Sequence, residues 1–466
     1  MTGTGVYGPG MTEISALTEI VGEGHVLTGE AISEDYGHDE ALTVTPELPL
    51  AVVRPGTTDE VAELVRWAAA WDVPLTARGS GTGLSGACVP RSDGVVVSFE
   101  RMADVVEIDT ANHVALVQPG VTLAQLDEAL RPHGLMYPVY PGEYSASLGG
   151  NVATNAGGMR AVRYGVTRHQ VLGLTAVLGT GEVLTTGGRF VKATSGYDLT
   201  QLIIGSEGTL AVVTEAILRL HPRLGHGATV LVPFPDLEHV TDAIPRIVGS
   251  GLSPSILEYI DFITMSAITT SAGLELGVPQ EVKDGALAYL VVVLEGRDAA
   301  RVEEDTAELA ELVSGIGAMD VYVLPPSAGA ALIEAREKAF WTAKASGADD
   351  IIDLVVPRAS MPEYLTQVQE VAQATGSLIV GCGHAGDGNV HLSVFQPDPD
   401  ARKKAVGGVL AAGVALGGAI SGEHGIGSEK KAYLAEIEDP AKLDLMRRIK
   451  QAFDPTNILN PGTIFD

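Results

Sequence analysis

Short apolar runs alternate with longer segments of helical spacing over residues 46–220. Residues 58–71 (TDEVAELVRWAAAW) place apolar side chains at helical intervals, with Thr58 as the expected N-cap and acidic residues in the first turn. Apolar runs bounded by proline, glycine or polar residues predict strands at 50–55, 74–78, 94–99, 114–117, 171–178 and 209–220. This alternation predicts a domain of mixed helices and strands.

A stretch rich in proline and glycine, residues 221–227 (HPRLGHG), follows the last of these strands and predicts a joint between domains. Beyond the joint, a strand is expected at 289–294 and a helix at 298–313, with Asp298 as its N-cap. The tail carries a basic helix at 442–453. We therefore expect three parts, comprising residues 1–223, 224–420 and 421–466.

Composition limits the classes of function. A chain of 466 residues is too long for one compact core, and no apolar run reaches the roughly 18 to 20 residues of a membrane span. The first residues lack the layout of a signal peptide, so we expect a cytoplasmic protein with a flexible extension of ten residues before a helix-like stretch at Met11. The net charge of −29 argues against nucleic acid and anionic membranes as partners, because both are polyanions.

Three glycine-rich elements mark the first half of the chain. Residues 78–86 (RGSGTGLSG) directly follow a predicted strand, and closely spaced glycines let backbone N–H groups approach a phosphate without a side-chain clash. This element lacks the helix start and the later acidic residue of a nicotinamide-binding fingerprint. Residues 149–158 (GGNVATNAGG) and 205–210 (GSEGTL) add two more such elements. Together, the three elements favour a binding site in which the backbone lies against a flat ligand and hydrogen-bonds to its polar edge. The alternative interpretation is that they form only tight turns and closely packed loops of small residues.

A second pattern lies near the C-terminus. Apolar runs at 378–381 and 390–395 flank the turn sequence AGDG, which predicts a hairpin with Cys382 opposite His391 and His384 on the same face as His391. Such a hairpin forms half of a metal site, although two ordinary histidines would fit the pattern as well. The adjacent pair Glu423 and His424 points in two directions, which favours one residue as a ligand and the other as a base. Two imidazoles and a carboxylate suit Zn²⁺ or Mn²⁺ and leave coordination positions open.

The glycine-rich elements, in this order and together with TSGYDL at 194–199 and IIGSEG at 203–208, resemble the FAD-binding domain of the p-cresol methylhydroxylase and vanillyl-alcohol oxidase superfamily. The resemblance implies an α+β fold in which a PCMH-type FAD-binding domain is followed by an α/β substrate (cap) domain. Thr82 stands where covalently flavinylated relatives carry a histidine, so we expect dissociable FAD, and Tyr144 stands where many relatives carry proline. The residues that the resemblance assigns to FAD are Arg78, Gly79, Ser80, Gly81, Thr82, Gly83, Leu84, Ser85, Pro141, Gly142, Gly149, Asn151, Thr154, Gly157, Gly158, Glu207, Gly208, Val213 and Asn460.

The C-terminal motifs resemble the FAD-linked D-2-hydroxyacid dehydrogenases, the family of D-lactate, D-2-hydroxyglutarate and glycolate enzymes. This resemblance covers residues from about 45 to 466 and is weakest between 225 and 330. It implies that the closing segment 453–462 returns to the flavin, although NPG at 460–462 also reads as a plain turn. The roles it implies are metal ligands at His384, His391 and Glu423, a general base at His424, and substrate binding by Arg336 with assistance from Lys344.

Instead of binding substrate, Arg336 could form a surface ion pair with Glu334 or Glu337 on the same helix. Ser393 stands where 2-hydroxyglutarate enzymes tend to have asparagine, which favours D-lactate or another short or hydrophobic D-2-hydroxy acid. In the mechanism that the resemblance implies, the metal holds the hydroxyl and one carboxylate oxygen, His424 takes the hydroxyl proton, and a hydride passes to flavin N5.

Two cysteines cannot supply the four thiolates of a typical iron–sulfur cluster. Electrons must therefore leave to an external acceptor: oxygen, a quinone or an electron-transfer protein. An oxygen-using alcohol oxidase, the flavoprotein subunit of a glycolate oxidase-type complex and a non-redox metalloprotein remain alternatives, and a homodimer remains open.

Overall fold

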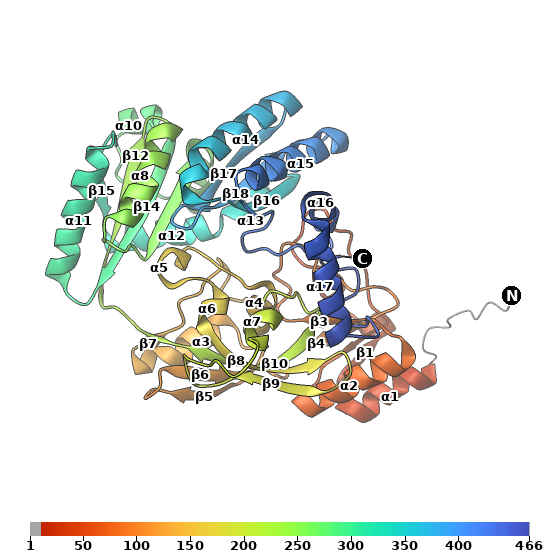
Figure 1. The fold of residues 1–466 in the computed structure, drawn as a ribbon. Coiled ribbons are helices and arrows are strands. Elements are labelled where there is room, and N and C mark those ends of the chain that lie inside the picture. The colour runs from red at the N-terminus through yellow and green to blue at the C-terminus, as the bar shows by residue number, and fades with distance from the viewer. Residues whose placement is uncertain (1–10, 466) are drawn as a thin grey trace.

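The computed structural model describes residues 11–465, and the flexible extension expected at residues 1–10 lies outside this range. Two layered regions lie one above the other, with the C-terminal segment beside both (Figure 1). The helix expected from Met11 is α1 (Met11–Val21). Within the described residues, no helix combines the length and apolar character needed to cross a membrane.

The N-terminal region contains two sheets and a short two-stranded ladder. The first sheet has the order β1-β2-β4-β3, in which β2, β4 and β3 run parallel and β1 is antiparallel to β2. The second is antiparallel, with the order β5-β6-β10-β8-β9. The strands are β1 (Val26–Thr28), β2 (Ala51–Val53), β3 (Leu75–Arg78), β4 (Val95–Ser98), β5 (Val105–Asp109), β6 (Val114–Val117), β8 (Val171–Leu178), β9 (Val183–Gly187) and β10 (Ala211–Arg219), with β7 (Leu135–Met136) pairing β11 (His221–Pro222).

Helices cover these sheets. They are α2 (Thr58–Trp71), α3 (Leu123–Leu130), α4 (Leu148–Thr154), α5 (Ala161–Tyr164), α6 (Thr167–Gln170) and α7 (Leu199–Ile203). The prediction of Thr58 as the N-cap of α2 was wrong by one residue. Thr57 has the extended backbone of a cap and accepts the N–H of Glu60, whereas Thr58 is already helical and donates its hydroxyl to Thr214.

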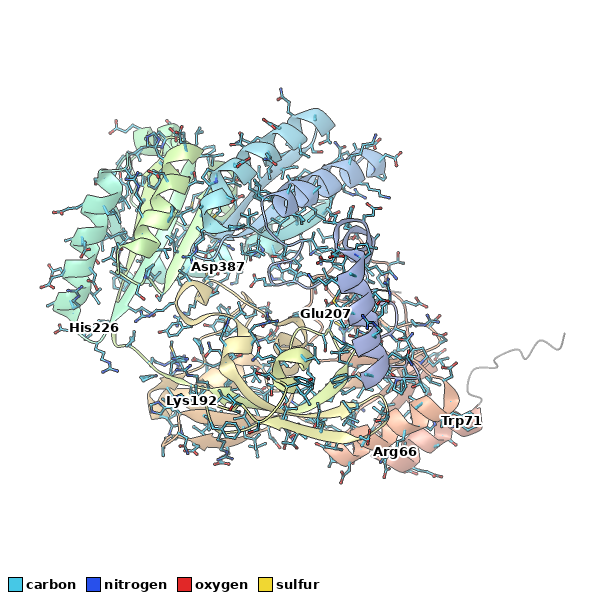
Figure 2. The ribbon with its side chains drawn as sticks, in the orientation of Figure 1. Arg66, Trp71, Lys192, Glu207, His226 and Asp387 are labelled. Carbon is cyan, nitrogen blue, oxygen red and sulfur yellow. The ribbon has the colours of Figure 1, made fainter. Side chains whose placement is uncertain are left out.

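The middle region is built on one antiparallel sheet of seven strands, in the order β15-β12-β14-β13-β17-β18-β16. Its strands are β12 (His226–Phe234), β13 (Ile256–Asp261), β14 (Ala288–Gly296), β15 (Tyr322–Leu324), β16 (Asp350–Val355), β17 (Leu378–His384) and β18 (Asn389–Phe395). His226 lies where the chain passes from the lower region to the upper one (Figure 2). None of the described sheets takes strands from both sides of residues 223–225.

Two sets of helices sandwich this sheet. The larger core joins the sheet to α8 (Leu237–Gly249), α11 (Ala299–Ser314), α14 (Met361–Thr375) and α15 (Pro399–Ala415). The other face packs against α9 (Phe262–Ala272), α10 (Gln280–Gly285), α12 (Pro326–Glu337) and α13 (Ala339–Ala345). Asp298 caps α11, as predicted. The face that carries α12 and α13 is turned toward the N-terminal region (Figure 1).

The C-terminal segment contains α16 (Lys431–Ile437) and α17 (Pro440–Phe453) and returns to the N-terminal region. The N–H of Leu75 donates to Ile458 at 2.7 Å, and the N–H of Asn460 donates to Leu75 at 2.8 Å. The buried Lys450 donates to the carbonyl oxygens of Thr209 and Leu459 and pairs with Asp454. These buried contacts confirm the predicted return of the tail.

Candidate active site

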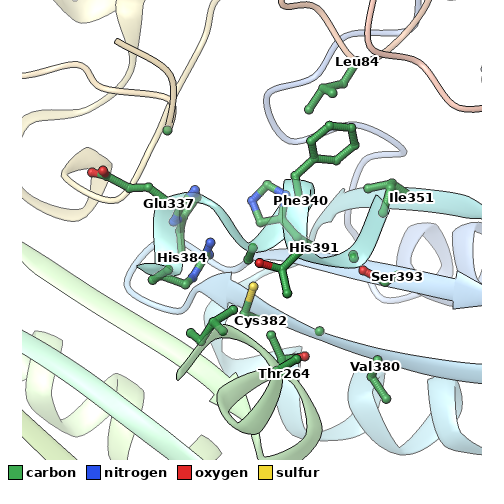
Figure 3. Close-up of a pocket in the computed structure, with 18 of the residues that line it drawn as sticks. Leu84, Thr264, Glu337, Phe340, Ile351, Val380, Cys382, His384, His391 and Ser393 are labelled. Carbon is green, nitrogen blue, oxygen red and sulfur yellow. The ribbon is translucent and has the colours of Figure 1, made fainter. Parts of the chain in front are cut away.

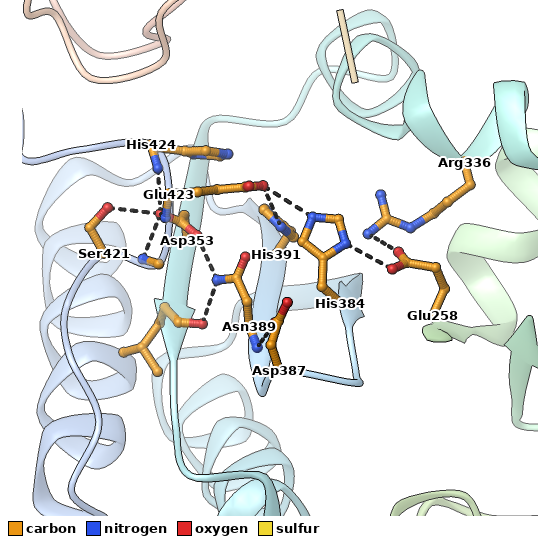
Figure 4. A network of polar contacts seen from close by, with 12 residues as sticks. Glu258, Arg336, Asp353, His384, Asp387, Asn389, His391, Ser421, Glu423 and His424 are labelled. Atoms are coloured by element: carbon orange, nitrogen blue, oxygen red, sulfur yellow. Dashed lines mark hydrogen bonds and ion pairs between the residues drawn. The ribbon is translucent and has the colours of Figure 1, made fainter. Parts of the chain in front are cut away.

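The predicted hairpin exists in the predicted register. Strands β17 and β18 pair with Cys382 opposite His391, and the turn between them occupies residues 385–388. The rings of His384 and His391 meet edge to face, with their centroids 4.9 Å apart. Both Nε2 atoms face the same oxygen, Oε1 of Glu423, at 3.1 Å from His384 and 3.3 Å from His391 (Figure 4).

A single buried carboxylate shapes the turn that carries Glu423 and His424. Oδ2 of Asp353 accepts the hydroxyl of Ser421 at 2.8 Å and the three successive N–H groups of residues 422–424 at 2.9 Å each. Asp353 lies on β16 directly opposite His391 on β18, so the sheet fixes the turn relative to the hairpin. Although burial favours the neutral acid, the neighbouring His424 and His391 hold the pKa of Asp353 well below its usual range.

Glu258 on β13 connects the histidine pair to Arg336. Its Oε1 lies 2.8 Å from Nδ1 of His384, and its Oε2 lies 2.7 Å from Nη2 of Arg336 (Figure 4). All three side chains are buried. Burial works against a charged imidazole, but Glu258 and Glu423 still raise the pKa of His384 well above its usual value. Contact with Glu258 fixes which nitrogen of His384 is directed at Glu423.

The surface ion pair considered for Arg336 was wrong. Its side chain is buried against Glu258, and Glu334 pairs instead with Lys338. Nη2 of Arg336 is engaged with Glu258, whereas its buried Nε makes no hydrogen bond within the described chain. The guanidinium therefore keeps a donor available for a carboxylate.

His424 presents an unpartnered nitrogen in the same place. Its Nδ1 is buried and makes no hydrogen bond to the described residues, and its ring centroid lies 5.1 Å from that of His391. Burial lowers the pKa of His424 from 6.5 to about 4. The imidazole is therefore neutral near neutral pH and able to accept a proton.

The donor set fits a metal ion. The ligand atoms of His384, His391 and Glu423 all lie within 4.8 Å of one another, and a second such group comprises Asp353, His391 and His424. Nε2 of His391 and Oε2 of Glu423 are buried without a hydrogen bond in the described chain. Asp353 already accepts five hydrogen bonds, which favours the first group as the metal ligands. Two imidazoles and one carboxylate match the ligand types of catalytic zinc or manganese.

A substrate-sized cavity of about 210 Å³ opens beside this group. Arg336, His384, His391, Glu423 and His424 line it, together with residues of β17, β18, α9, α12 and α13 (Figure 3). The cavity does not include Lys344, which pairs with Glu40 at 2.6 Å and is 40% exposed. The structure thus brings Arg336 to the metal-ligand group but not Lys344, whose role in substrate binding stays a prediction.

The glycine-rich elements line an adjacent cavity. It shares Leu84, Pro141, Glu423 and His424 with the substrate cavity, so the two meet at the proposed base. Of the residues expected to hold FAD, those that line it are Gly79, Ser80, Gly81, Thr82, Gly83, Leu84, Ser85, Pro141, Asn151, Thr154, Glu207 and Gly208. Ala77, Ala87 and Cys88 also line it and were not predicted.

The other residues expected at the cofactor lie outside this lining, and one of them, Gly142, lines the substrate cavity instead. They are Arg78, Gly142, Gly149, Gly157, Gly158, Val213 and Asn460. A Cβ atom at Gly157 would lie 2.5 Å from Oε2 of Glu423, so only glycine lets this backbone approach the metal ligand. Asn460 donates Nδ2 to the carbonyl oxygens of Ala87 and Glu207 and thereby joins the tail to the cavity wall.

Glu207 belongs to the N-terminal region and lies near its boundary with the upper region (Figure 2). Its two carboxylate oxygens accept the N–H groups of Ile426 and Gly427 at 2.8 and 2.7 Å. Burial raises the pKa of Glu207 to about 7. Glu207 thereby holds the turn after His424 against the cofactor side of the molecule.

Comparison with known proteins identifies the family. Residues 224–464, more than half of the chain, match the C-terminal domain of FAD linked oxidases, and residues 49–187 match the FAD binding domain. The chain belongs to the FAD-linked oxidases. It is therefore an FAD-linked oxidoreductase, and the second cavity described above lies in a cofactor-binding fold of known type.

Relatives and solved structures agree with this assignment. The chain is 58% identical to an uncharacterized FAD-linked oxidoreductase of Mycobacterium tuberculosis, over 98% of this chain and 99% of that one. It is 38% identical to a D-lactate dehydrogenase of Archaeoglobus fulgidus (93% and 96% covered) and 32% identical to a D-2-hydroxyglutarate dehydrogenase of Stutzerimonas stutzeri (97% and 98%). The structure of p-cresol methylhydroxylase matches with a TM-score of 0.78 at 18% identity, covering 98% of this chain and 96% of that one, which confirms the expected fold class. The chain is an oxidoreductase of the D-lactate, D-2-hydroxyglutarate and glycolate dehydrogenase type.

Proposed function

We propose that this FAD-linked oxidoreductase oxidises a D-2-hydroxy acid with a short or apolar side chain to the 2-keto acid. The observation that carries the proposal is the convergence, in one cavity, of a neutral buried base, a guanidinium with an unused donor and a group of side chains that fits a metal ion. These three groups match the hydroxyl, the carboxylate and the chelating pair of oxygens of a 2-hydroxy acid.

Each residue has one role. Arg336 binds and orients the substrate carboxylate through its positive charge and its free Nε–H. His424 accepts the hydroxyl proton at its unpartnered Nδ1, as the α-carbon loses its hydrogen with an electron pair. Glu258 and Asp353 hold His384 and the 421–424 turn in place. In this way one C–H and one O–H bond break and a carbonyl forms. The substrate loses one hydride, which carries both electrons, and one proton.

Bound FAD supplies the acceptor for the hydride at its isoalloxazine ring. A divalent metal held by His384, His391 and Glu423 would supply a positive charge that lowers the pKa of the substrate hydroxyl. The two electrons then leave to an external acceptor, which we take to be a quinone, an electron-transfer protein or oxygen.

Anaerobic reduction of the bound flavin tests the proposal. The holoenzyme is mixed with a panel of D- and L-2-hydroxy acids, and the visible flavin band is followed. Bleaching by D-acids and not by their L-enantiomers supports the proposal, whereas a flavin that no hydroxy acid bleaches overturns it. Peroxide formation under air, without an added acceptor, then distinguishes an oxidase from a dehydrogenase.

A further inference from the structure

The acidic and basic side chains of the substrate cavity gather at one end. They are Arg336, Glu337, His384, His391, Glu423 and His424. The opposite part is lined by apolar side chains, including Ile351 and Val380, which lie on the other side of the pocket from His384 and Glu337 (Figure 3). A 2-hydroxy acid bound with its carboxylate at Arg336 would therefore direct its side chain along an apolar wall.

This apolar end continues into a surface groove between α9 and α13. The groove, of about 530 Å³, shares Ile263, Ala267, Thr342 and Ser346 with the substrate cavity. Its further lining residues are Phe262, Ser266, Thr270, Ser271 and Ala345, so none of the described residues that line it is charged. From residue 263 to residue 271, α9 rises by about 12 Å. This length far exceeds what the methyl group of lactate can fill.

Large apolar side chains remain exposed along this path. Phe262 is 41% exposed, Ile263 48% and Leu378 48%, and Ile263 and Leu378 line the cavity while Phe262 lines the groove. Exposed apolar surface that adjoins a binding cavity is typical of a ligand-binding groove.

We propose that the substrate carries a medium-length, unbranched apolar tail that occupies this groove, so that the enzyme acts on D-2-hydroxy fatty acids. The inference rests on the proposed function, since it places the hydroxy acid at His424 and Arg336. The polar head lies at the metal-ligand group, and the tail runs past Ala267 between α9 and α13 to the surface. Phe262 and Ile263 cover the outer part of the tail.

The same lining disfavours a dicarboxylic acid. Among the described residues that line the cavity or the groove, Arg336 is the only lysine or arginine, and Glu258 already pairs with it. A second carboxylate in the apolar half would be removed from water without a cation, which is costly. A 2-hydroxyglutarate side chain therefore does not fit this half of the cavity.

A chain-length series on the holoenzyme tests the proposal. We expect kcat/KM for anaerobic flavin reduction to rise from D-lactate to D-2-hydroxydecanoate by about fourfold for each buried methylene group. Each acid is used below its micelle-forming concentration. If D-lactate reduces the flavin as efficiently as the long acids, the tail site is overturned and the proposed function stands. If no acid of the series reduces the flavin, the proposed function itself fails.

Two variants locate the tail. Ala267→Phe fills the path at the junction of cavity and groove, and we expect the ratio of kcat/KM for D-2-hydroxydecanoate to that for D-lactate to fall at least tenfold. Thr270→Trp, at an exposed position, narrows the outer groove without disturbing packing and should lower the same ratio. The matched control is Ala272→Phe, which makes the same change on α9 outside the lining of both spaces. A ratio that is unchanged in both groove variants overturns the placement of the tail.

Discussion

Glu258 holds His384 through a buried contact of 2.8 Å between Oε1 and Nδ1. The second oxygen of Glu258 faces Arg336, so one carboxylate fixes both a histidine proposed as a metal ligand and the residue proposed to bind the substrate carboxylate. The proposed metal-binding group and the guanidinium are thereby linked through a buried carboxylate.

Removal of the charge of Glu258 should therefore weaken metal binding. We expect Glu258→Gln to lower the metal affinity by about 10- to 100-fold, because carboxylates behind ligating histidines orient the ring and increase its basicity. Metal content after dialysis against graded chelator concentrations measures the effect. Glu295→Gln is the matched control, since Glu295 lies on β14 of the same sheet and pairs with Arg160 away from the metal ligands. Equal metal retention in both variants would contradict the role given to Glu258.

Substitution of Arg336 should affect substrate binding more than substitution of Lys344. We expect Arg336→Lys to raise KM for the hydroxy acid by about tenfold or more, because a lysine keeps the charge and loses the planar pair of donors. Lys344→Ala provides the comparison, since Lys344 pairs with Glu40 outside the cavity lining. Steady-state kinetics with an artificial acceptor gives KM and kcat for both. If the larger increase in KM belongs to Lys344→Ala, the assignment of Arg336 is wrong.

Metal removal should stop turnover and leave the flavin bound. Among the described residues, Glu423 is the one proposed metal ligand that also lines the glycine-rich cavity, so a chelator should remove the metal without dismantling the cofactor site. We expect loss of substrate-dependent bleaching with an unchanged flavin spectrum, and recovery after addition of Mn²⁺ or Zn²⁺. Full activity in protein shown to be free of metal would rule out the metal assignment.

The hairpin of β17 and β18 was predictable because its information is local. Alternating apolar positions and a glycine-rich turn fix the register, and with it the pairing of Cys382 and His391. The error at the cap of α2 is also local, since Thr57 and Thr58 are chemically equal and only the backbone distinguishes them. The glycine-rich elements predicted the cofactor-binding region because a backbone that approaches a ligand closely requires glycine, and closely spaced glycines are visible in the sequence.

Glu258 and Asp353 were missed because their partners are distant in sequence. Each belongs to a buried strand, and each reaches the site only through the strand order β13-β17-β18-β16, which no local pattern specifies. A signal was present in both: a lone acid within an otherwise apolar strand segment, ILEYI for Glu258 and IIDLV for Asp353. Buried carboxylates of this kind require partners, so such a position marks a polar site whose members must be sought elsewhere in the chain.

The depressed pKa of His424 leads to a prediction about pH. Burial lowers this pKa from 6.5 to about 4, so the proton-accepting form persists to lower pH than for an ordinary histidine. The rate of flavin reduction at saturating substrate should therefore stay level from about pH 8 down to about pH 5, and a decline centred near the usual histidine pKa would contradict the prediction.

His424→Ala should retain FAD and reduce the rate of flavin reduction by about 10²- to 10⁴-fold, the range expected for loss of a general base. His239→Ala is the control, because His239 lies half exposed beside Asp236 and outside the site. Rapid reduction of the flavin in His424→Ala would remove His424 as the base, whatever the pH profile shows.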